Sequence, residues 1–135
     1  MKKKLFLFVD GASRGNPGPA AAGIVLKDQD GEVLLKKGQF FGRMTNNEAE
    51  YRALLLGLEL VGKFKPEVLV CLSDSKLVVS QINGLFRVKK PHLRKLLLKI
   101  RQAEGGYQRV LYKLIPREKN VAADALANHV LNQVK

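Results

Sequence analysis

The sequence predicts an α/β domain with a five-stranded mixed sheet flanked by helices. Apolar segments typical of strands come three times in succession near the start, and strand-like and helical segments then alternate to the end. The chain has 135 residues, of which 46% are hydrophobic, enough for one core and too few for a second. We therefore expect a single domain over residues 1–135.

The first three strands are expected to be antiparallel. Residues 5–9 form an apolar run that predicts a strand with Asp10 at its carboxyl end. Residues 20–27 and 32–41 predict two more strands, and the Asp-Gly pair between them is a hairpin signal. Connections this short join antiparallel neighbours.

From Asn46 the apolar spacing changes to that of a helix, which we expect to end near Gly62. Thr45 can cap this helix, and Glu48 three residues later completes a capping box. Glu50 stands four residues before a leucine of the apolar stripe, so it leans toward the packed face.

The last two strands are expected to run parallel to the first. Residues 67–72 predict a buried strand that leads directly into a helix over residues 74–82, an order that implies a crossover to a parallel neighbour. Pro91 begins the next helix, which a Gly-Gly pair ends. Residues 110–115 predict the last strand, and Asn120 caps the final helix.

The charge balance points to a polyanionic partner. There are 24 Lys and Arg against 12 Asp and Glu, a net charge of +12, so nucleic acid is the first partner to consider and an anionic membrane surface the second. Residues 75–103 contain no acid and predict a phosphate-binding ridge, although a solvated helix face is the default for such a run. The ridge residues are Lys76, Arg87, Lys89, Lys90, Arg94, Lys95, Lys99 and Arg101.

Cys71 is the single cysteine, which excludes an internal disulfide and favours a reducing, cytoplasmic setting. The first apolar run is too short for a secretory signal, which needs roughly 7–15 apolar residues. No stretch approaches the ~20 apolar residues of a membrane span, so no membrane partner is expected. We expect a monomer because no predicted strand or helix is left uncommitted.

Four acids occupy comparable places: Asp10, Glu50, Asp74 and Asp124 follow strands or lie in the first turns of helices. In an open α/β sheet such positions converge on one crevice. Four carboxylates there are compatible with divalent cations, and oxygen ligands select Mg²⁺ or Mn²⁺. Each acid also has a structural alternative: Asp10 as a turn-former, Asp74 as a helix cap, and Asp124 as a first-turn acid.

Four motifs resemble, in order and spacing, those of the type 1 ribonuclease H family: FVDGASRGNPGPAAAG, TNNEAEYRALLLGLE, LSDSKLVVSQING and REKNVAADALA. The resemblance runs from about residue 5 to 130. It implies a ribonuclease H-like fold and a two-metal endonuclease that hydrolyses the RNA strand of RNA/DNA hybrids, leaving 5′-phosphate and 3′-hydroxyl ends. Asp10, Glu50, Asp74 and Asp124 are the implied ligands of the two ions, and the motif selects Glu50 rather than Glu48.

The same resemblance assigns substrate contacts. It implies that three asparagines enter the minor groove, that an arginine and a threonine hold a DNA phosphate, and that Gln81 joins them or is an ordinary exposed glutamine. The asparagines are Asn16, Asn46 and Asn47, and the arginine and threonine are Arg43 and Thr45. Lys89 and Lys90 lie in a shortened basic protrusion. Reading 2′-hydroxyls and groove shape predicts cleavage with little sequence preference. Double-stranded RNA stays open as a second substrate.

The chain departs from the family pattern after its last strand, where many members carry a histidine. Arg117 stands there and resembles the arginine of a shorter branch of the family. A guanidinium stays charged, so it can grip a phosphate or assist product release but cannot act as a general base. An ordinary surface arginine is the alternative.

Two other functions compete with the nuclease. A non-catalytic hybrid-binding module would gain by losing its acids, yet all four are present. A phosphomonoesterase with Asp10 as nucleophile usually needs a second acid two residues later, where this chain has Ala12.

Overall fold

The computed structural model describes residues 3–134, so the predicted domain bounds at residues 1 and 135 lie outside it. Five strands, four α-helices and two short 3₁₀ helices follow one another in the predicted order. They are β1 (Lys4–Ser13), β2 (Gly18–Lys27), β3 (Val33–Met44), α1 (Asn46–Val61), η1 (Gly62–Phe64), β4 (Val68–Ser73), α2 (Lys76–Ile82), α3 (Pro91–Glu104), β5 (Arg109–Leu114), η2 (Arg117–Lys119) and α4 (Val121–Asn132). Among these helices none is long and apolar enough to cross a lipid bilayer.

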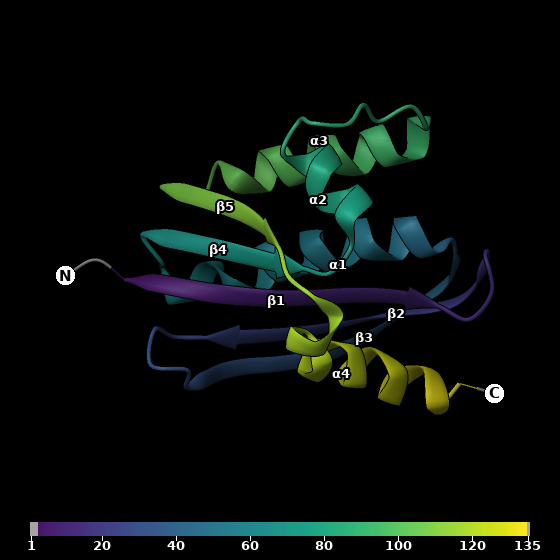
Figure 1. Cartoon of the computed structure of the whole chain (residues 1–135), viewed down its shortest axis with the longest axis horizontal. Helices are drawn as coiled ribbons and strands as arrows, with labels where there is room; N and C mark the ends of the chain where they lie inside the picture. Colours follow the sequence, from purple (N-terminus) through teal and green to yellow (C-terminus); the bar gives the residue numbers. More distant parts are fainter. Residues whose placement is uncertain (1–2, 135) are drawn as a thin grey trace.

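The strands form one mixed sheet in the order β3-β2-β1-β4-β5 (Figure 1). β2 pairs antiparallel with both β1 and β3, whereas β4 is parallel to β1 and to β5. The predicted fold class and strand directions are therefore confirmed.

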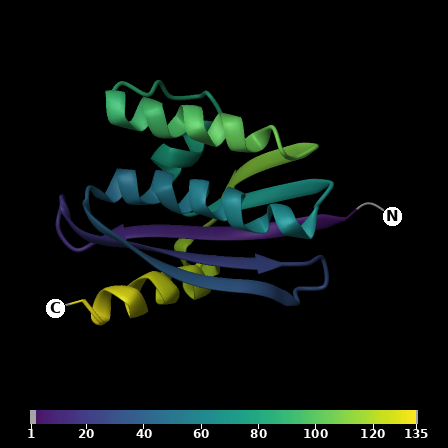
Figure 2. The ribbon, with the colours of Figure 1, turned by 180° about the vertical axis from the view of Figure 1, so that it is seen from behind.

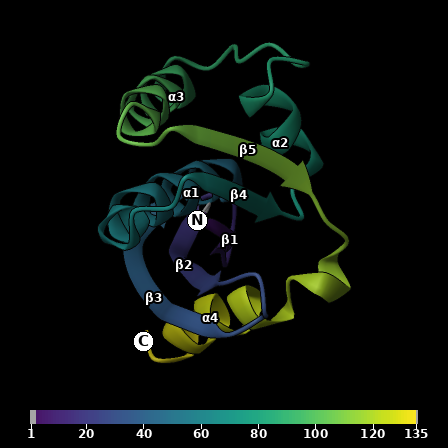
Figure 3. The same ribbon diagram turned by 90° about the vertical axis from the view of Figure 1, so that its left-hand side faces the viewer.

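Helices cover the sheet unequally. α1 and α3 lie together on one face, and α4 lies on the other, next to β2 and β3 (Figures 2 and 3). The main core fills the space under α1 and α3, where Leu7 of β1 and Tyr51 of α1 are fully buried. Burial of such large apolar side chains stabilises the fold by about 1.5–3 kcal/mol each.

Two glycines let helices approach the central strands closely. A Cβ on Gly11 would lie 2.2 Å from the backbone oxygen of Ala49 in α1, and one on Gly23 would lie 1.8 Å from that of Ala123 in α4. Only glycine fits at such contacts. The two contacts fix α1 and α4 against opposite faces of the sheet, beside Asp10.

The prediction that the first strand ends at Asp10 is wrong. β1 continues to Ser13 because β2 supplies partners along its whole length, from Phe6↔Lys27 to Ser13↔Ala20. Its pairing with β4, by contrast, stops at Phe8↔Leu72. Asp10 therefore lies inside a strand, just beyond the point where β1 and β4 separate.

The capping of two helices differs from the prediction. Ser75, not Asp74, caps α2: its side-chain oxygen accepts from the backbone N–H of Val78 at 3.3 Å, so the helix begins at Lys76. Asn120 occupies the cap position of α4, but its Oδ1 accepts no capping hydrogen bond, while its Nδ2 donates to Val9 O of β1.

The cap of α1 is confirmed in part. Thr45 accepts from the backbone N–H of Glu48 at 3.2 Å, as predicted. The Glu48 carboxylate does not complete the capping box; it lies 3.6 Å from the Arg52 guanidinium instead. The remaining strand boundaries differ from the predicted ones by at most three residues, and the end of β2 at Lys27 matches.

Candidate metal centre and nucleic-acid interface

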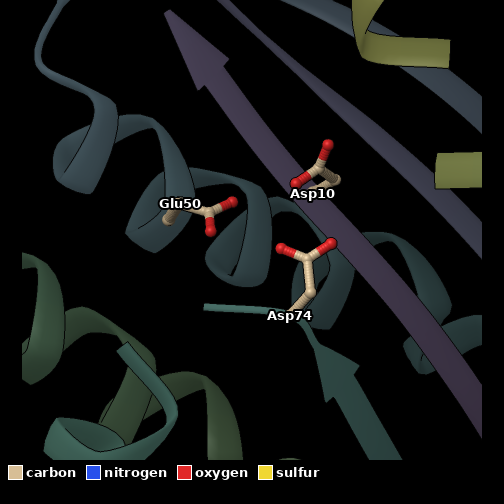
Figure 4. Close-up of side chains that lie close together, drawn as sticks. All are labelled: Asp10, Glu50 and Asp74. Atoms are coloured by element: carbon tan, nitrogen blue, oxygen red, sulfur yellow. The ribbon is translucent and has the colours of Figure 1, made fainter. Parts of the chain in front are cut away.

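Three carboxylates from distant parts of the sequence meet at the carboxyl edge of the sheet. Asp10 of β1, Glu50 of α1 and Asp74, directly after β4, each offer an oxygen within 4.8 Å of the others (Figure 4). Asp10 and Glu50 are both buried, with 6% of their surface exposed, and Asp74 is partly exposed. Carboxylates that lie this close together and are shielded from solvent repel each other strongly unless protons or cations neutralise them.

Local structure explains each position. Asp10 lies where β1 has no β4 neighbour, so its side chain has room beside the end of β4. Gly11 admits α1 to the strand, and its backbone N–H donates to Glu50 Oε1 at 2.5 Å. Asp74 stands between the last residue of β4 and Ser75, the cap of α2. The fold thus brings the three carboxylates together at one place.

The protonation of the cluster reflects this crowding. Burial, followed by the charge of Glu50, raises the pKa of Asp10 from 3.8 to about 9. Burial also raises the pKa of Glu50 from 4.5 to about 7, although the hydrogen bond from Gly11 favours its ionised form. Without a bound cation the pair therefore retains protons near neutral pH.

Asp124 is the fourth predicted acid and lies outside the three-carboxylate group. It sits in the first turn of α4, and its side chain is close enough to Asp10 to raise the pKa of that carboxyl through a hydrogen bond and through its charge. All four predicted acids are thus neighbours, with Asp124 adjoining the cluster from α4. A set of hard oxygen donors fits Mg²⁺ or Mn²⁺.

Asn120 is a site residue that the sequence predicts only as a helix cap. Its side chain is 1% exposed, and its Nδ2 donates to Val9 O at 2.9 Å and to Asp74 Oδ2 at 3.1 Å. The amide therefore ties the start of α4 to β1 and to one carboxylate of the cluster. No sequence signal separates this role from an N-cap, because asparagine is also a common cap.

Two of the predicted groove-reading asparagines hold the β1–β2 turn against α1. Asn16 Oδ1 accepts from the backbone N–H of Asn46 at 3.0 Å, and Asn46 Oδ1 accepts from Ser13 N–H at 3.3 Å. Both residues are exposed, and Asn46 lies one helical turn before Glu50 on α1. The two hydrogen bonds fix the separation of the turn from the helix start.

The other predicted contacts surround the start of α1. Arg43 is exposed at the end of β3, and Thr45 is partly exposed and caps α1. A shallow hollow of about 150 Å³ is lined by Asn47, Lys89 and Lys90, together with Leu77, Gln81, Arg87 and Leu93. The structure therefore places predicted contacts from α1, α2 and the residues before α3 around one depression.

Gln81 is not the exposed glutamine of the alternative interpretation. It is 8% exposed, and its Oε1 accepts from the Tyr51 hydroxyl at 2.5 Å while its Nε2 donates to Arg87 O at 3.4 Å. These bonds join α1, α2 and the loop that follows. Its contact with substrate stays a prediction, as does that of Arg117, which is exposed in η2.

Comparison with known proteins assigns the class. Residues 8–130 match the reverse transcriptase-like family. The RNase H1 of Halobacterium salinarum is 40% identical to this chain. The match covers 97% of this chain and 99% of that one, with a TM-score of 0.94. LC11-RNase H1, solved with an RNA/DNA hybrid, is 36% identical, with a TM-score of 0.89 over 93% of this chain and 94% of that one. This chain belongs to the type 1 ribonuclease H family.

Several relatives are longer than this chain. The bifunctional protein Rv2228c of Mycobacterium tuberculosis is 42% identical over 96% of this chain, which spans 36% of that relative's length. Ribonuclease HI of Halobacterium salinarum is 40% identical, again over 96% of this chain, and the match covers 65% of that protein. The shared part is in both cases the domain described above.

Proposed function

We propose that this chain is a metal-dependent endonuclease that hydrolyses the RNA strand of RNA/DNA hybrids. The observation that carries the proposal is the meeting of Asp10, Glu50 and Asp74 within 4.8 Å, beside the asparagines of the β1–β2 turn and α1. A relative 36% identical was solved in complex with an RNA/DNA hybrid, which supports the same substrate here.

The acids are the groups that would hold the metal. Asp10, Glu50 and Asp74, with Asp124 beside them, offer enough carboxylate oxygens for two divalent ions. Mg²⁺ or Mn²⁺ held by these carboxylates would activate the attacking water and stabilise the leaving oxygen. The raised pKa values of Asp10 and Glu50 mean that protons must leave as metal binds, so metal affinity rises with pH.

Recognition would rely on shape and on the RNA backbone. The exposed amides of Asn16 and Asn46 stand next to the acids, where they can meet 2′-hydroxyls in a minor groove. Arg43, Lys89 and Lys90 add positive charge for the phosphates of the DNA strand. We infer little sequence preference, and we propose that the domain acts as a monomer in the cytoplasm.

The deciding experiment uses an end-labelled RNA/DNA hybrid with Mg²⁺, Mn²⁺ or EDTA. Internal cuts confined to the RNA, giving 5′-phosphate ends and absent in EDTA, are the expected result. Double-stranded RNA and single-stranded RNA run in parallel define the substrate range. Tight hybrid binding without cleavage under every metal would instead establish a binding module, and turnover of a small phosphate ester would point to a phosphatase.

A further inference from the structure

One part of the sheet carries no helix. α4 packs against β1, β2 and β3, whereas β4, β5 and the first half of β1 present a bare surface on that side of the sheet (Figures 1 and 3). The strand register places aliphatic side chains of β2, β4 and β5 on this side, and among them six aromatic or basic residues: Lys4, Phe6 and Phe8 of β1, Lys27 of β2, and Arg109 and Lys113 of β5. These six residues are called the open sheet face below.

The open sheet face combines aromatic rings with cations. Phe6 and Phe8 are partly exposed; Lys4 Nζ lies 5.7 Å from the Phe6 ring centroid and Lys27 Nζ lies 5.2 Å from that of Phe8. Arg109 and Lys113 are exposed on the adjoining strand. Along the paired positions of β1, β2, β4 and β5 on this side, the sole acid is Asp10, which lies at the metal centre.

Covering the sheet explains only part of this arrangement. The valines beneath, Val25 and Val70, are 1% exposed, so the rings and lysine stems do shield the strands. Shielding alone does not require four cations, none of which forms an ion pair within the described part of the chain, since like charges repel. The excess charge is complementary to a polyanion.

The spacing of the two phenylalanine rings favours single-stranded nucleic acid over a duplex as the partner of this surface. Phe6 and Phe8 are two residues apart on one strand, or about 6.6 Å. Bases in a duplex are stacked about 3.4 Å apart and offer no free faces to protein rings. An unpaired, extended strand can stack one base on each ring while its phosphates meet the surrounding cations.

Of the two strands of a bound hybrid, the RNA strand that is cleaved at the acids can reach this surface. Phe8 and Asp10 point to the same side of β1, and the connection from β5 to α4 crosses in front of β1 between the bare surface and α4 (Figure 1). That connection carries exposed Arg117 and Lys119 on either side of exposed Glu118, so its net charge is positive. A strand with a phosphate at Asp10 can therefore extend over η2 onto Phe8.

We propose that the open sheet face binds a single-stranded segment of RNA that continues from the cleaved strand of the hybrid. The inference rests on the proposed function for the identity of that strand. The site is distinct from the acids and asparagines that hold the duplex, so it affects affinity for branched or frayed substrates rather than the chemical step.

The test compares labelled hybrids in EDTA, where the RNA stays intact. One is blunt, and others carry a single-stranded RNA extension of about ten nucleotides at one end or the other, a length within the usual site size. An extension at one end is expected to strengthen binding about tenfold or more, the effect of stacking one or two bases. The gain should disappear in the double variant Phe6→Leu/Phe8→Leu, whereas binding of the blunt hybrid stays unchanged.

A second pair of variants separates charge from packing. Arg109→Gln/Lys113→Gln should reduce the gain and lower the salt slope for the extension by about 0.7 per cation removed. Lys37→Gln/Lys63→Gln removes the same charge from exposed positions away from this surface and should leave the gain intact. If Phe6→Leu/Phe8→Leu melts at a much lower temperature than the wild type, its loss of binding is not informative. The comparison of Arg109→Gln/Lys113→Gln with Lys37→Gln/Lys63→Gln then decides whether the open sheet face binds the extension.

Three results would overturn the inference. The first is a blunt hybrid cleaved with metal but no gain in affinity from either extension, which would leave the proposed function standing. The second is an equal, Phe-dependent gain from DNA extensions. The third is equal competition by polyglutamate, which would reveal a general anion surface. If the hybrid is not cut at all, the proposed function fails, while Phe-dependent binding of single-stranded RNA still supports the surface.

Discussion

Glu50 and Glu48 lie two residues apart on α1 and have unrelated environments. Glu50 is buried, accepts from Gly11 N–H and lies in the acidic cluster, whereas Glu48 is on the surface beside Arg52. Burial and neighbouring charge, rather than residue type, separate the proposed metal ligand Glu50 from the more exposed Glu48. The two glutamates therefore form a matched pair for mutagenesis.

Glu50→Gln should lower the rate of hybrid cleavage at least 100-fold, because it removes a ligand oxygen from the cluster. Glu48→Gln should retain wild-type activity and cost about 0.3–0.5 kcal/mol of stability, because an exposed helix ion pair is removed. Initial rates with Mg²⁺ and melting curves measure the two effects. Near-normal cleavage by Glu50→Gln would refute the assignment of this acid.

The raised pKa of Asp10 predicts how stability depends on pH. Between the ordinary value of 3.8 and about 9, the folded protein holds a proton that the unfolded chain has released. The free energy of unfolding of the metal-free protein should therefore fall as pH rises through this window.

Asp10→Asn removes this titration and should flatten the pH dependence. At pH 8 in EDTA we expect the variant to exceed the wild type in stability by at least about 1.4 kcal/mol, the free energy of one pKa unit. The difference should shrink below the ordinary pKa of the carboxyl. Calorimetry across the pH range measures it, and a variant less stable than wild type at pH 8 would contradict the prediction.

At the scale of elements, the connection from β5 to α4 is fastened by one side chain. Asn120 bonds Val9 of β1 and the carboxylate of Asp74, so it positions the start of α4 and hence Asp124. It is a positioning residue, since it acts on the acids rather than on substrate.

Asn120→Ala should raise the Mg²⁺ concentration needed for half-maximal cleavage and lower the maximal rate about 10–100-fold, as for other residues that orient metal ligands. Stability should fall by about 1–3 kcal/mol because the Val9 carbonyl loses a buried partner. A merely structural role would leave the Mg²⁺ dependence unchanged, so titration of the metal distinguishes the two.

The close approach of β1 and α1 makes another prediction. Gly11→Ala would place a Cβ within 2.2 Å of Ala49 O, and backbone cannot move away cheaply. We expect α1 to shift, with a loss of about 1–3 kcal/mol of stability and a larger loss of cleavage because Glu50 moves with the helix. Gly106→Ala is the control for the removal of a glycine, because Gly106 is exposed after α3, lacks a left-handed φ, and its Cβ would come no closer than 3.6 Å to Ala103 O. Normal activity in Gly11→Ala would show that the close approach is not needed.

Prediction from sequence worked best where periodicity and turn residues agree. The bounds of α1 and α3 follow from apolar spacing and from Thr45, Pro91 and glycine at the helix ends, and the structure matches them. Prediction from sequence placed the end of β1 wrongly, because an acid after an apolar run resembles a strand end when the partner strand is unknown. The second role of Asn120 and the burial of Gln81 depend on contacts between distant elements, which local pattern does not encode.

For the whole molecule, the net charge of +12 should make hybrid binding strongly dependent on salt. Lys89→Gln/Lys90→Gln should reduce the slope of log affinity against log salt by about 0.9 for each phosphate that a lysine no longer neutralises. The rate at saturating hybrid should change little, because the two lysines line a separate hollow and do not belong to the carboxylate cluster. Binding titrations at several salt concentrations check this, and an unchanged slope would exclude the two lysines from the interface.

The separation of β1 from β4 after Phe8 also bears on the order of folding. The two strands pair in parallel across a long stretch of intervening chain, a non-local pairing that is slow to form because loop closure costs entropy. Until that pairing exists, Asp74 has no reason to be near Asp10, so its charge does not yet add to that of Glu50. The repulsion that Asp74 contributes therefore arises only when β1 and β4 have paired.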